Sequence, residues 1–400
     1  MMTVQVGIVG KPNTGKSTFF AASTLIDVKR APYPFTTIEP NVGVGYVRVQ
    51  CVCKELGVKD NPRNSICIDG WRFIPVELID VAGLVPGAWE GRGLGNMFLD
   101  HLRRAPVLIH VVDASGGTDE EGRPVPPGTH DPLQDVFFLE KEFAMWMLQV
   151  VSRDWEKISK LIDLQKKYDE LYAKFTGLGV DVGVVDKALE ELSLKTKKAT
   201  SWTREDLMHL VEYVMRKAKP MVIAANKADL DVSEDNIKRM AKELGDRYTV
   251  VPTSAEAELA LRKAEKAGLI RYIPGDPDFE IVGKPTREQE KALEYIREKV
   301  LKRWGSTGVQ KAIDTAVFEK LGMIVVFPVE NEKKFSDSHG NVLPDALLVS
   351  KEATARDLAY QIHTDIGRRF SFAIDARTGQ RVSASEKLRH RMVIKIVVAH

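Results

Sequence analysis

The chain has 400 residues, of which 44% are hydrophobic and 28% are charged. This length exceeds that of one ordinary domain, and the composition supports packed cores and excludes a disordered chain. The net charge is only +2, so no global field would recruit nucleic acid, and we expect no sequence-specific DNA binding. The N-terminus has no basic, apolar leader, and no stretch reaches bilayer length. We therefore expect a cytoplasmic protein of several domains with no membrane partner.

Short apolar runs predict the strands of an α/β domain. The expected strands are Val4–Val9, Pro75–Ile79, Val107–Val112, Met221–Ala225 and Tyr248–Pro252. Helical stretches separate most of them, which implies a doubly wound, mostly parallel sheet covered on both faces. Polar residues follow several of these strands, at the edge where open α/β sheets bind ligands.

Two further regions differ in pattern from this sheet. Beyond a loop rich in glycine and proline at Ser115–Pro132, apolar residues recur every three or four positions. We expect a helical hairpin inserted between two strands, either as a cap or as a docking arm for a partner. From about Phe318 onward, short strands surround an amphipathic helix, Thr354–Ile362, with Thr354 as its N-cap. This segment is long enough for a separate α+β domain.

The glycine loop after the first strand carries the strongest motif. Residues Gly10–Thr18 match G-x-x-x-x-G-K-[ST], between a strand and a helix. In such a loop the backbone N–H groups surround the β-phosphate, Lys16 reaches the β- and γ-phosphate oxygens, and the Ser17 hydroxyl ligates Mg²⁺. The expected nucleotide contacts of this loop are Asn13, Thr14, Gly15, Lys16, Ser17 and Thr18.

Two later motifs follow strands in the order that a nucleotide switch requires. Asp80-Val81-Ala82-Gly83 predicts a carboxylate that holds Mg²⁺ and, at Gly83, an N–H that senses the γ-phosphate. In Asn226-Lys227-Ala228-Asp229, the Asp229 carboxylate can accept hydrogen bonds from guanine N1–H and N2–H₂, two donors that adenine lacks.

The rest of the base site is expected around this aspartate. Asn226 would tie the loops together, and the Lys227 stem would stack on the base. After the next strand, Ser254 and Ala255 would bring a backbone N–H near guanine O6.

Together with Pro34–Asn41 and Gly83–Gly95, these motifs resemble the Obg-type GTPases. The helical insertion and a looser match to a β-grasp TGS domain over Leu343–Val398 resemble the YchF-like branch. The resemblance implies Mg²⁺-dependent hydrolysis of GTP to GDP and phosphate, in a switch linked to the ribosome or to structured RNA. It also implies four segments: a G domain in residues 1–130 and 216–317, the second part with a helical extension, a helical insertion in residues 131–215, and a TGS-like domain in residues 318–400.

The same resemblance assigns further site residues. Phe35 and Thr36 would contact the nucleotide, and Thr37 would be the switch threonine that ligates Mg²⁺, with Thr36 as the alternative. Leu84 stands where Ras-like proteins have a glutamine that orients water, so intrinsic hydrolysis should be slow. In related GTPases an asparagine at the position of Asn13 helps to hold K⁺ beside the phosphates, where the ion offsets developing charge. The implied catalytic set is Lys16, Asn13, Thr37 and Gly83, and the implied Mg²⁺ ligands are Ser17, Thr37 and Asp80.

Two other functions stay open on the sequence. The chain could be an RNA-binding or ribosome-binding factor for which the nucleotide is mainly a conformational ligand. It could also be an NTPase that prefers ATP, since YchF members often carry glutamate in place of the last aspartate of N-K-x-D. Asp229 argues for guanine.

Weaker signals have ordinary structural explanations beside functional ones. Cys51, Cys53 and Cys67 would hold zinc if a fourth ligand existed, but none is evident nearby, so we expect buried thiols. His101 and His110 are expected to pack rather than to catalyse. Between Arg368 and Lys395, Lys and Arg outnumber acidic residues by six, which indicates either an RNA-binding face or a solvated strand face.

Overall fold

The computed structural model describes residues 3–24, 42–81 and 103–399. It contains two compact units. The first comprises Met1–Val6, Ser17–Ile79 and Ser254–His400, and the second comprises Gly7–Lys16 and Asp80–Thr253. These units do not follow the four segments implied by the resemblance, whose bounds stay a prediction.

In the first unit, β2 (Val42–Gln50) and β3 (Ile66–Ile68) both pair with β4 (Trp71–Asp80). The strand β1 (Gln5–Val9) leads into the second unit, where the strand order is β5 (Val107–Asp113), β6 (Met221–Asn226) and β7 (Thr249–Pro252). The strands β5, β6 and β7 are parallel, and the register places Asp113 beside Asn226 at one edge. Every residue of β5 and β6 is buried, as in parallel strands covered on both faces. The expected α/β fold is confirmed.

The strand β2 was not among the predicted strands, and it forms a long antiparallel ladder with β4. The strand β2 pairs with β4 from Val42↔Ile79 to Gln50↔Trp71, and β3 also runs antiparallel to β4. Glycines interrupt the apolar pattern of β2, because a Cβ at Gly45 would lie 2.5 Å from Leu78 Cδ1. The sequence pattern therefore shows β2 weakly, although the ladder is long.

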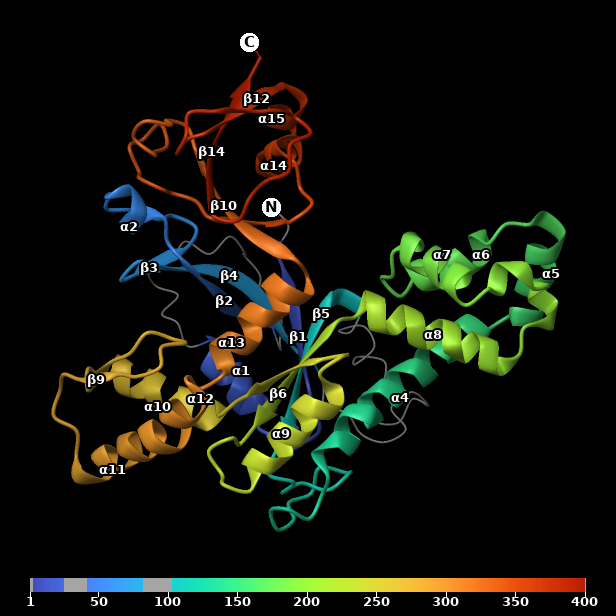
Figure 1. The fold of residues 1–400 in the computed structure, drawn as a ribbon, viewed down its shortest axis with the longest axis horizontal. Coiled ribbons are helices and arrows are strands. Elements are labelled where there is room, and N and C mark those ends of the chain that lie inside the picture. The colour runs from blue at the N-terminus through green and yellow to red at the C-terminus, as the bar shows by residue number, and fades with distance from the viewer. Residues whose placement is uncertain (1–2, 25–41, 82–102, 400) are drawn as a thin grey trace. The chain divides into compact units, whose positions relative to one another are not determined.

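The helical insertion of the second unit contains more than a hairpin. Its helices are α4 (Pro132–Ser152), α5 (Trp155–Gln165), α6 (Asp169–Thr176), α7 (Val182–Glu191) and α8 (Arg204–Ala218), with α9 (Ser233–Leu244) following β6. Left-handed residues interrupt the chain between these helices, for example Lys166 at φ +56° and Ser193 at φ +56°. Figure 1 shows α5, α6 and α7 grouped along α8, in green. The rings of Trp155 and Trp202 stack there with centroids 5.3 Å apart.

In the first unit, α1 (Lys16–Thr24) and α2 (Cys53–Leu56) precede a region with its own apolar core. This region contains α10 (Ala255–Lys266), β8 (Ile270–Arg271), β9 (Glu280–Ile281), α11 (Arg287–Ile296), α12 (Lys302–Trp304) and α13 (Val309–Asp314), with π-helical turns at Arg297–Leu301 and Thr315–Lys320. Leu261, Tyr272 and Leu293 belong to its core. The expected helical extension after β7 is therefore present as a packed region.

The C-terminal part forms a second sheet in the order β11-β10-β14-β12-β13. Its elements are β10 (Met323–Val329), β11 (Leu347–Ser350), α14 (Ala355–Ile362), α15 (Thr364–Arg368), β12 (Phe370–Asp375), β13 (Arg381–Val382) and β14 (Met392–Val398). The central strands β10 and β14 are parallel, and Leu358 and Ala359 of α14 are buried in the core with Ile394. Thr354 caps α14 in a reciprocal capping box with Asp357, which confirms the expected N-cap.

Candidate functional site

The glycine loop lies between β1 and α1, and its backbone has little room for side chains. Gly15 has φ +94°, and a Cβ there would lie 2.1 Å from Asn226 Nδ2. A Cβ at Gly10 would lie 2.6 Å from the Val111 carbonyl oxygen. Both positions therefore require glycine. The loop leads into α1, and a helix N-terminus favours anions.

Lys16 and Asp80 form an ion pair within the second unit. Lys16 is the lysine of the glycine loop, and Asp80 is the last residue of β4. The two motifs, 64 positions apart in the sequence, therefore meet in space. They bring a cation and a carboxylate together at the end of the loop, which is what phosphates and a divalent metal ion would need.

The N-K-x-D segment is tied directly to the glycine loop. Asn226 is buried, and its Nδ2 donates to the Thr14 carbonyl oxygen at 2.8 Å. The Lys227 ammonium contacts the buried Asp113 carboxylate at 2.7 Å, and Lys227 has φ +62°. These contacts fix the chain on both sides of Asn226, so that Asp229, which is partly exposed, follows a rigid turn. The expected role of Asn226 as a tie between loops agrees with this geometry.

Thr253, the residue after β7, is hydrogen-bonded to the N-K-x-D turn. The Ala228 N–H donates to the Thr253 carbonyl oxygen at 3.0 Å, and the Thr253 N–H donates to Ala225 at 2.9 Å. In the first unit, Ser254 precedes α10, and its N–H donates to the Thr307 carbonyl oxygen at 2.8 Å. Ala255, the first residue of α10, is buried.

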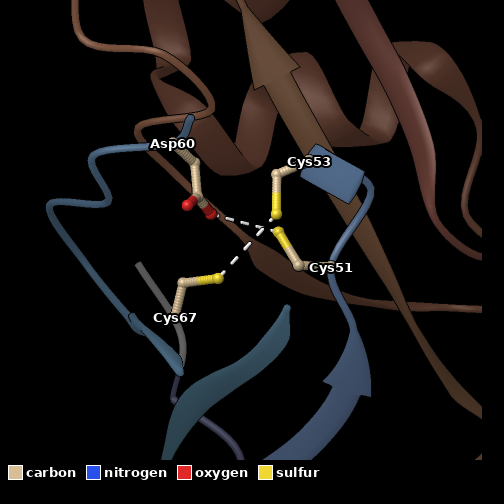
Figure 2. A group of neighbouring side chains, drawn as sticks. All are labelled: Cys51, Cys53, Asp60 and Cys67. Carbon is tan, nitrogen blue, oxygen red and sulfur yellow. Dashed lines mark hydrogen bonds between the residues drawn. The ribbon is translucent and has the colours of Figure 1, made fainter. Parts of the chain in front are cut away.

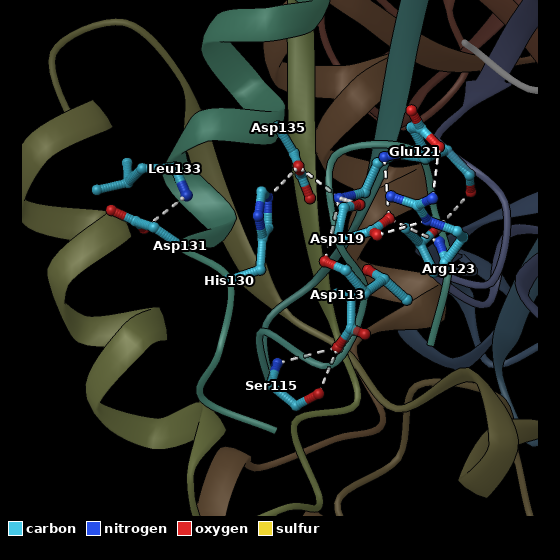
Figure 3. Close-up of polar contacts among 12 residues, drawn as sticks. Asp113, Ser115, Asp119, Glu121, Arg123, His130, Asp131, Leu133 and Asp135 are labelled. Carbon is cyan, nitrogen blue, oxygen red and sulfur yellow. Dashed lines mark hydrogen bonds and ion pairs between the residues drawn. The ribbon is translucent and has the colours of Figure 1, made fainter. Parts of the chain in front are cut away.

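A loop cover over the glycine loop was missed by the sequence reasoning. We use the term loop cover for Ser115–Asp131, between β5 and α4 (Figure 3). The buried Lys11 ammonium donates to the Asp119 carbonyl oxygen at 2.6 Å and to Asp135 Oδ1, at the start of α4, also at 2.6 Å. His130 Nε2 lies 2.7 Å from the same Asp135 oxygen. The loop cover is therefore held against the glycine loop by buried charges.

Asn13 also contacts the loop cover. Its Nδ2 donates to the Gly122 carbonyl oxygen at 2.8 Å, so the side chain expected to hold K⁺ is oriented by this loop. The signal that could have revealed the cover is the lysine at a variable position of the glycine loop. A lysine there needs either phosphate or a carboxylate, and the nearest carboxylate in space is more than a hundred positions away.

Burial dominates the electrostatics around Lys11. Burial raises the pKa of Asp135, although the Lys11 ammonium opposes this effect. His110 lies on β5 and is fully buried, and burial together with the Lys11 charge lowers its pKa to about 3. His110 is therefore neutral at physiological pH and packs in the core, as expected from the sequence.

Several predicted site residues lie outside the described residues. They are Phe35, Thr36, Thr37, Gly83, Leu84 and His101. Their assigned roles stay predictions. Ser17 and Thr18 lie in the first turn of α1, where Ser17 is exposed.

Most positive charges of the basic C-terminal segment, Arg368 to Lys395, are paired with carboxylates in the structure. Six of its eight Lys and Arg residues pair with carboxylates, some of which come from outside the segment. The six are Arg368, Arg377, Lys387, Arg389, Arg391 and Lys395. Within the described part of the chain, Arg369 and Arg381 have no carboxylate partner. Arg381 instead lies over the Phe372 ring, 3.9 Å from its centroid. The excess positive charge is thus concentrated at few positions.

Among the described residues, no helix is both long and apolar enough to cross a membrane.

Three family models match this chain. The one described as "50S ribosome-binding GTPase" matches residues 5–135. The one described as "Obg-like GTPase YGR210-like, G4 motif-containing domain" matches residues 224–331, and the TGS domain matches residues 339–398.

Individual relatives match over much of the chain. An uncharacterised GTP-binding protein of Methanocaldococcus jannaschii is 51% identical over 397 residues, covering 98% of this chain and 99% of that protein. The ribosome-binding ATPase YchF of Bacillus subtilis is 29% identical over 273 residues, covering 66% of this chain and 69% of that protein. The crystal structure of a GTP-binding protein from Pyrococcus horikoshii is 43% identical, with a TM-score of 0.79 over 99% of this chain and 100% of that one. This chain therefore belongs to the YchF-like branch of the Obg-type GTPases and carries a C-terminal TGS domain.

Proposed function

We propose that this protein hydrolyses GTP to GDP and phosphate with Mg²⁺, and that the cycle switches its association with the ribosome in the cytoplasm. The observation that carries the proposal is the joining of three motifs in one unit. Lys16 pairs with Asp80, and Asn226 is bonded to the Thr14 carbonyl oxygen of the glycine loop. Phosphate binding, metal binding and base recognition would thus be mechanically linked.

The donor set suits a magnesium ion. The Ser17 hydroxyl and the Asp80 carboxylate are hard oxygen ligands, which Mg²⁺ prefers. Mg²⁺ would neutralise charge on the β- and γ-phosphates. On nucleotide binding, Lys16 would exchange Asp80 for phosphate oxygens, and Asp80 would turn to the metal. Lys16→Ala should therefore abolish tight GTP binding, which a fluorescent GTP analogue titrated with Mg²⁺ or with a chelator would measure.

Asp229 supports guanine as the base. A carboxylate can accept both guanine donors, whereas with adenine it would lose its partners on desolvation. Asp229→Asn should weaken GTP binding by about 2–4 kcal/mol and favour xanthosine triphosphate, whose extra carbonyl needs a donor. Asp231→Asn, an exposed change in the same turn, is the matched control. Equal affinity of the unmodified protein for ATP and GTP would refute guanine selectivity and favour the activity named for the Bacillus subtilis relative.

The ribosomal link is supported by names of relatives rather than by a described surface. One matching family is a ribosome-binding GTPase family, and one relative is named a ribosome-binding ATPase. Cosedimentation with ribosomal subunits in GDP, GTP or a non-hydrolysable analogue tests the switch directly. Nucleotide-independent cosedimentation would contradict it.

Multiple-turnover phosphate release separates the switch from the second function. A GTPase switch should turn over faster when ribosomal subunits are added, because the protein lacks the glutamine that orients water in Ras-like enzymes. Binding to subunits with GTP but without turnover would instead favour a factor that uses the nucleotide as a conformational ligand.

A further inference from the structure

All three cysteines of the chain meet at one place, together with a carboxylate. One ligand atom from each of Cys51, Cys53, Asp60 and Cys67 lies within 4.8 Å of the other three. Figure 2 shows the three sulfurs and the Asp60 carboxylate converging from separate segments. Cys51 and Cys53 are buried, whereas Asp60 and Cys67 are partly exposed. The absence of a fourth ligand, which argued against metal in the sequence, is thereby corrected: Asp60 supplies it, seven positions after Cys53.

The local fold fixes these residues on a rigid frame. Cys51 follows β2, and its N–H donates to the Gly70 carbonyl oxygen at 2.8 Å. Cys53 begins α2, which ends at Gly57 with φ +64°. Cys67 lies in β3, where it pairs with Arg72 of β4. Strand pairing with β4 therefore holds Cys67 directly and Cys51 at the end of β2, and α2 holds Cys53.

The distances suit a tetrahedral metal ion better than a disulfide. Cys53 Sγ and Cys67 Sγ are 4.0 Å apart. Two sulfurs bound tetrahedrally at about 2.3 Å from zinc lie about 3.8 Å from each other. A disulfide requires about 2.05 Å between sulfurs, so it would need a much larger movement. Cys51 Sγ and Asp60 Oδ2 are 3.1 Å apart, which a bound ion would widen by a fraction of an ångström.

Arg72 supplies the charge and the outer hydrogen bonds that such a centre needs. It is fully buried, and its Nη2 donates to Asp60 Oδ2 at 2.8 Å and lies 3.5 Å from Cys51 Sγ. Three thiolates and one carboxylate around a divalent ion leave an excess negative charge, which the guanidinium partly offsets. Outer partners of this kind orient metal ligands and strengthen binding.

We propose that Cys51, Cys53, Cys67 and Asp60 bind one Zn²⁺ in a closed, four-coordinate structural site. Thiolates are the ligands that select zinc among common divalent ions, and four protein ligands leave no position for catalysis. On binding, the thiol protons pass to solvent and the carboxylate turns an oxygen from its hydrogen bonds to the metal.

The site has a structural consequence within the first unit. The residues that follow Asp60 form hydrogen bonds with the segment Asn341–Ala346. The Asn61 N–H donates to the Val342 carbonyl oxygen at 3.0 Å, and the Arg63 N–H donates to Pro344 at 2.7 Å. Arg72 itself donates to the Leu343 carbonyl oxygen at 3.0 Å. Zinc would therefore fix the surface to which the start of the TGS match is attached.

Metal content of the full-length, tag-free protein, purified from zinc-supplemented medium under reducing conditions, tests the site. We expect about one zinc per chain that survives dialysis against a mild chelator. Asp60→Asn should lower zinc affinity by at least about tenfold, since loss of even an outer partner costs that much. Cys67→Ser should remove most of the metal. The matched control is Asp69→Asn, an exposed carboxylate in the same hairpin, which should retain full zinc content.

Cobalt substitution keeps the test informative if Cys67→Ser folds poorly. Metal-free unmodified protein titrated with Co²⁺ should develop thiolate-to-metal charge-transfer absorption and the visible bands of a tetrahedral centre. A purified protein without zinc and without these bands, or a Cys67→Ser variant that binds as much metal as the unmodified protein, would overturn the proposal. Intact mass lower by two hydrogen atoms would indicate a disulfide instead.

Hydrogen exchange tests the structural consequence separately. Metal removal should increase exchange in residues 60–67 and 341–346, while the amides paired between β12 and β14 stay protected. Unchanged exchange in zinc-free protein would refute the role of the metal in attaching the Asn341–Ala346 segment.

Discussion

Replacing Lys11 with methionine removes the cation that holds the loop cover to the glycine loop. The Lys11 and Asp135 side chains are only 2% and 3% exposed, and their charged atoms are 2.6 Å apart. Methionine preserves the aliphatic stem, so the change isolates the ammonium group. It leaves Asp135 with His130 as a partner, while Asp135 Oδ2 already lacks a hydrogen-bond partner.

The expected cost is large because a buried carboxylate loses its counter-ion. Removing one partner of a buried pair typically costs about 3–5 kcal/mol, whereas an exposed pair contributes at most about 1 kcal/mol. A loss of about 3 kcal/mol in the local opening free energy corresponds to a roughly hundredfold increase in amide exchange. The double variant Lys11→Met/Asp135→Leu should recover much of this loss, because no buried charge remains unpaired.

The pH dependence follows from Asp135. Burial already raises the pKa of this carboxyl in the unmodified protein. Without Lys11 the pKa rises further, and an acid whose folded pKa is raised contributes stability that is lost as pH rises through that value. The deficit of Lys11→Met should therefore shrink when the pH is lowered from about 8 to about 5, because the buried carboxyl becomes neutral.

Native-state hydrogen exchange is the suitable assay, because a chain with two compact units need not unfold in one step. The informative amides are those of Gly128 and His130, which donate to Ser115 and Gly116 within the loop cover at 2.7 and 3.0 Å. Lys238→Met, which breaks an exposed pair with Glu234, is the matched control and should change exchange little. Equal exchange in Lys11→Met and in the control, at every pH, would refute the reasoning.

Three further predictions rest on other parts of the structure. Burial raises the pKa of Asp314 to about 7, so stability should fall as pH rises from about 4 through 7. The fall should be somewhat below about 4 kcal/mol, because Asp314 keeps some solvent contact. Native-state hydrogen exchange around α13 should show this fall in the unmodified protein but not in Asp314→Asn, and identical pH profiles would contradict the assignment. Single-turnover GTP hydrolysis should be faster in K⁺ than in Na⁺, and Asn13→Ala should remove most of this difference while GTP affinity stays nearly unchanged. Equal rates of the unmodified protein in both salts would instead favour a catalytic group supplied by a partner. If the C-terminal region contacts RNA, Arg381→Gln should reduce the slope of log binding constant against log salt concentration by about one. Lys387→Gln should reduce this slope less, because Lys387 is already paired with Glu352. Equal effects would show that ion pairing does not decide which cations are available to RNA.

The parallel strands, the order of the nucleotide motifs and the family could all be predicted from the sequence alone. Continuous apolar runs such as those of β5 and β6 reveal buried parallel strands, because both faces must be apolar. Motifs such as Gly10–Thr18 can be recognised in a sequence, because local backbone geometry and phosphate chemistry restrict which residue types occur at the key positions. The capping box at Thr354 was predictable for the same local reason.

Which side chains lie next to each other in space could not be predicted without the fold. For Lys11 and Asp135 only the lysine gives a signal, because its partner carboxylate is more than a hundred positions away in the sequence. The ligand atoms of Cys67 and Asp60 lie within 4.8 Å of each other only because the fold of their segment brings them together. The long strand β2 was not predicted for a related reason. Its glycines are required because side chains from other elements leave no room for a Cβ, and neighbouring residues in the sequence do not reveal this. The balance of the C-terminal charges also depends on partners from elsewhere, such as Glu55 beside Arg377 and Arg391. Sequence patterns report what each segment requires locally, whereas burial of charge and convergence of ligands depend on contacts that exist only after folding.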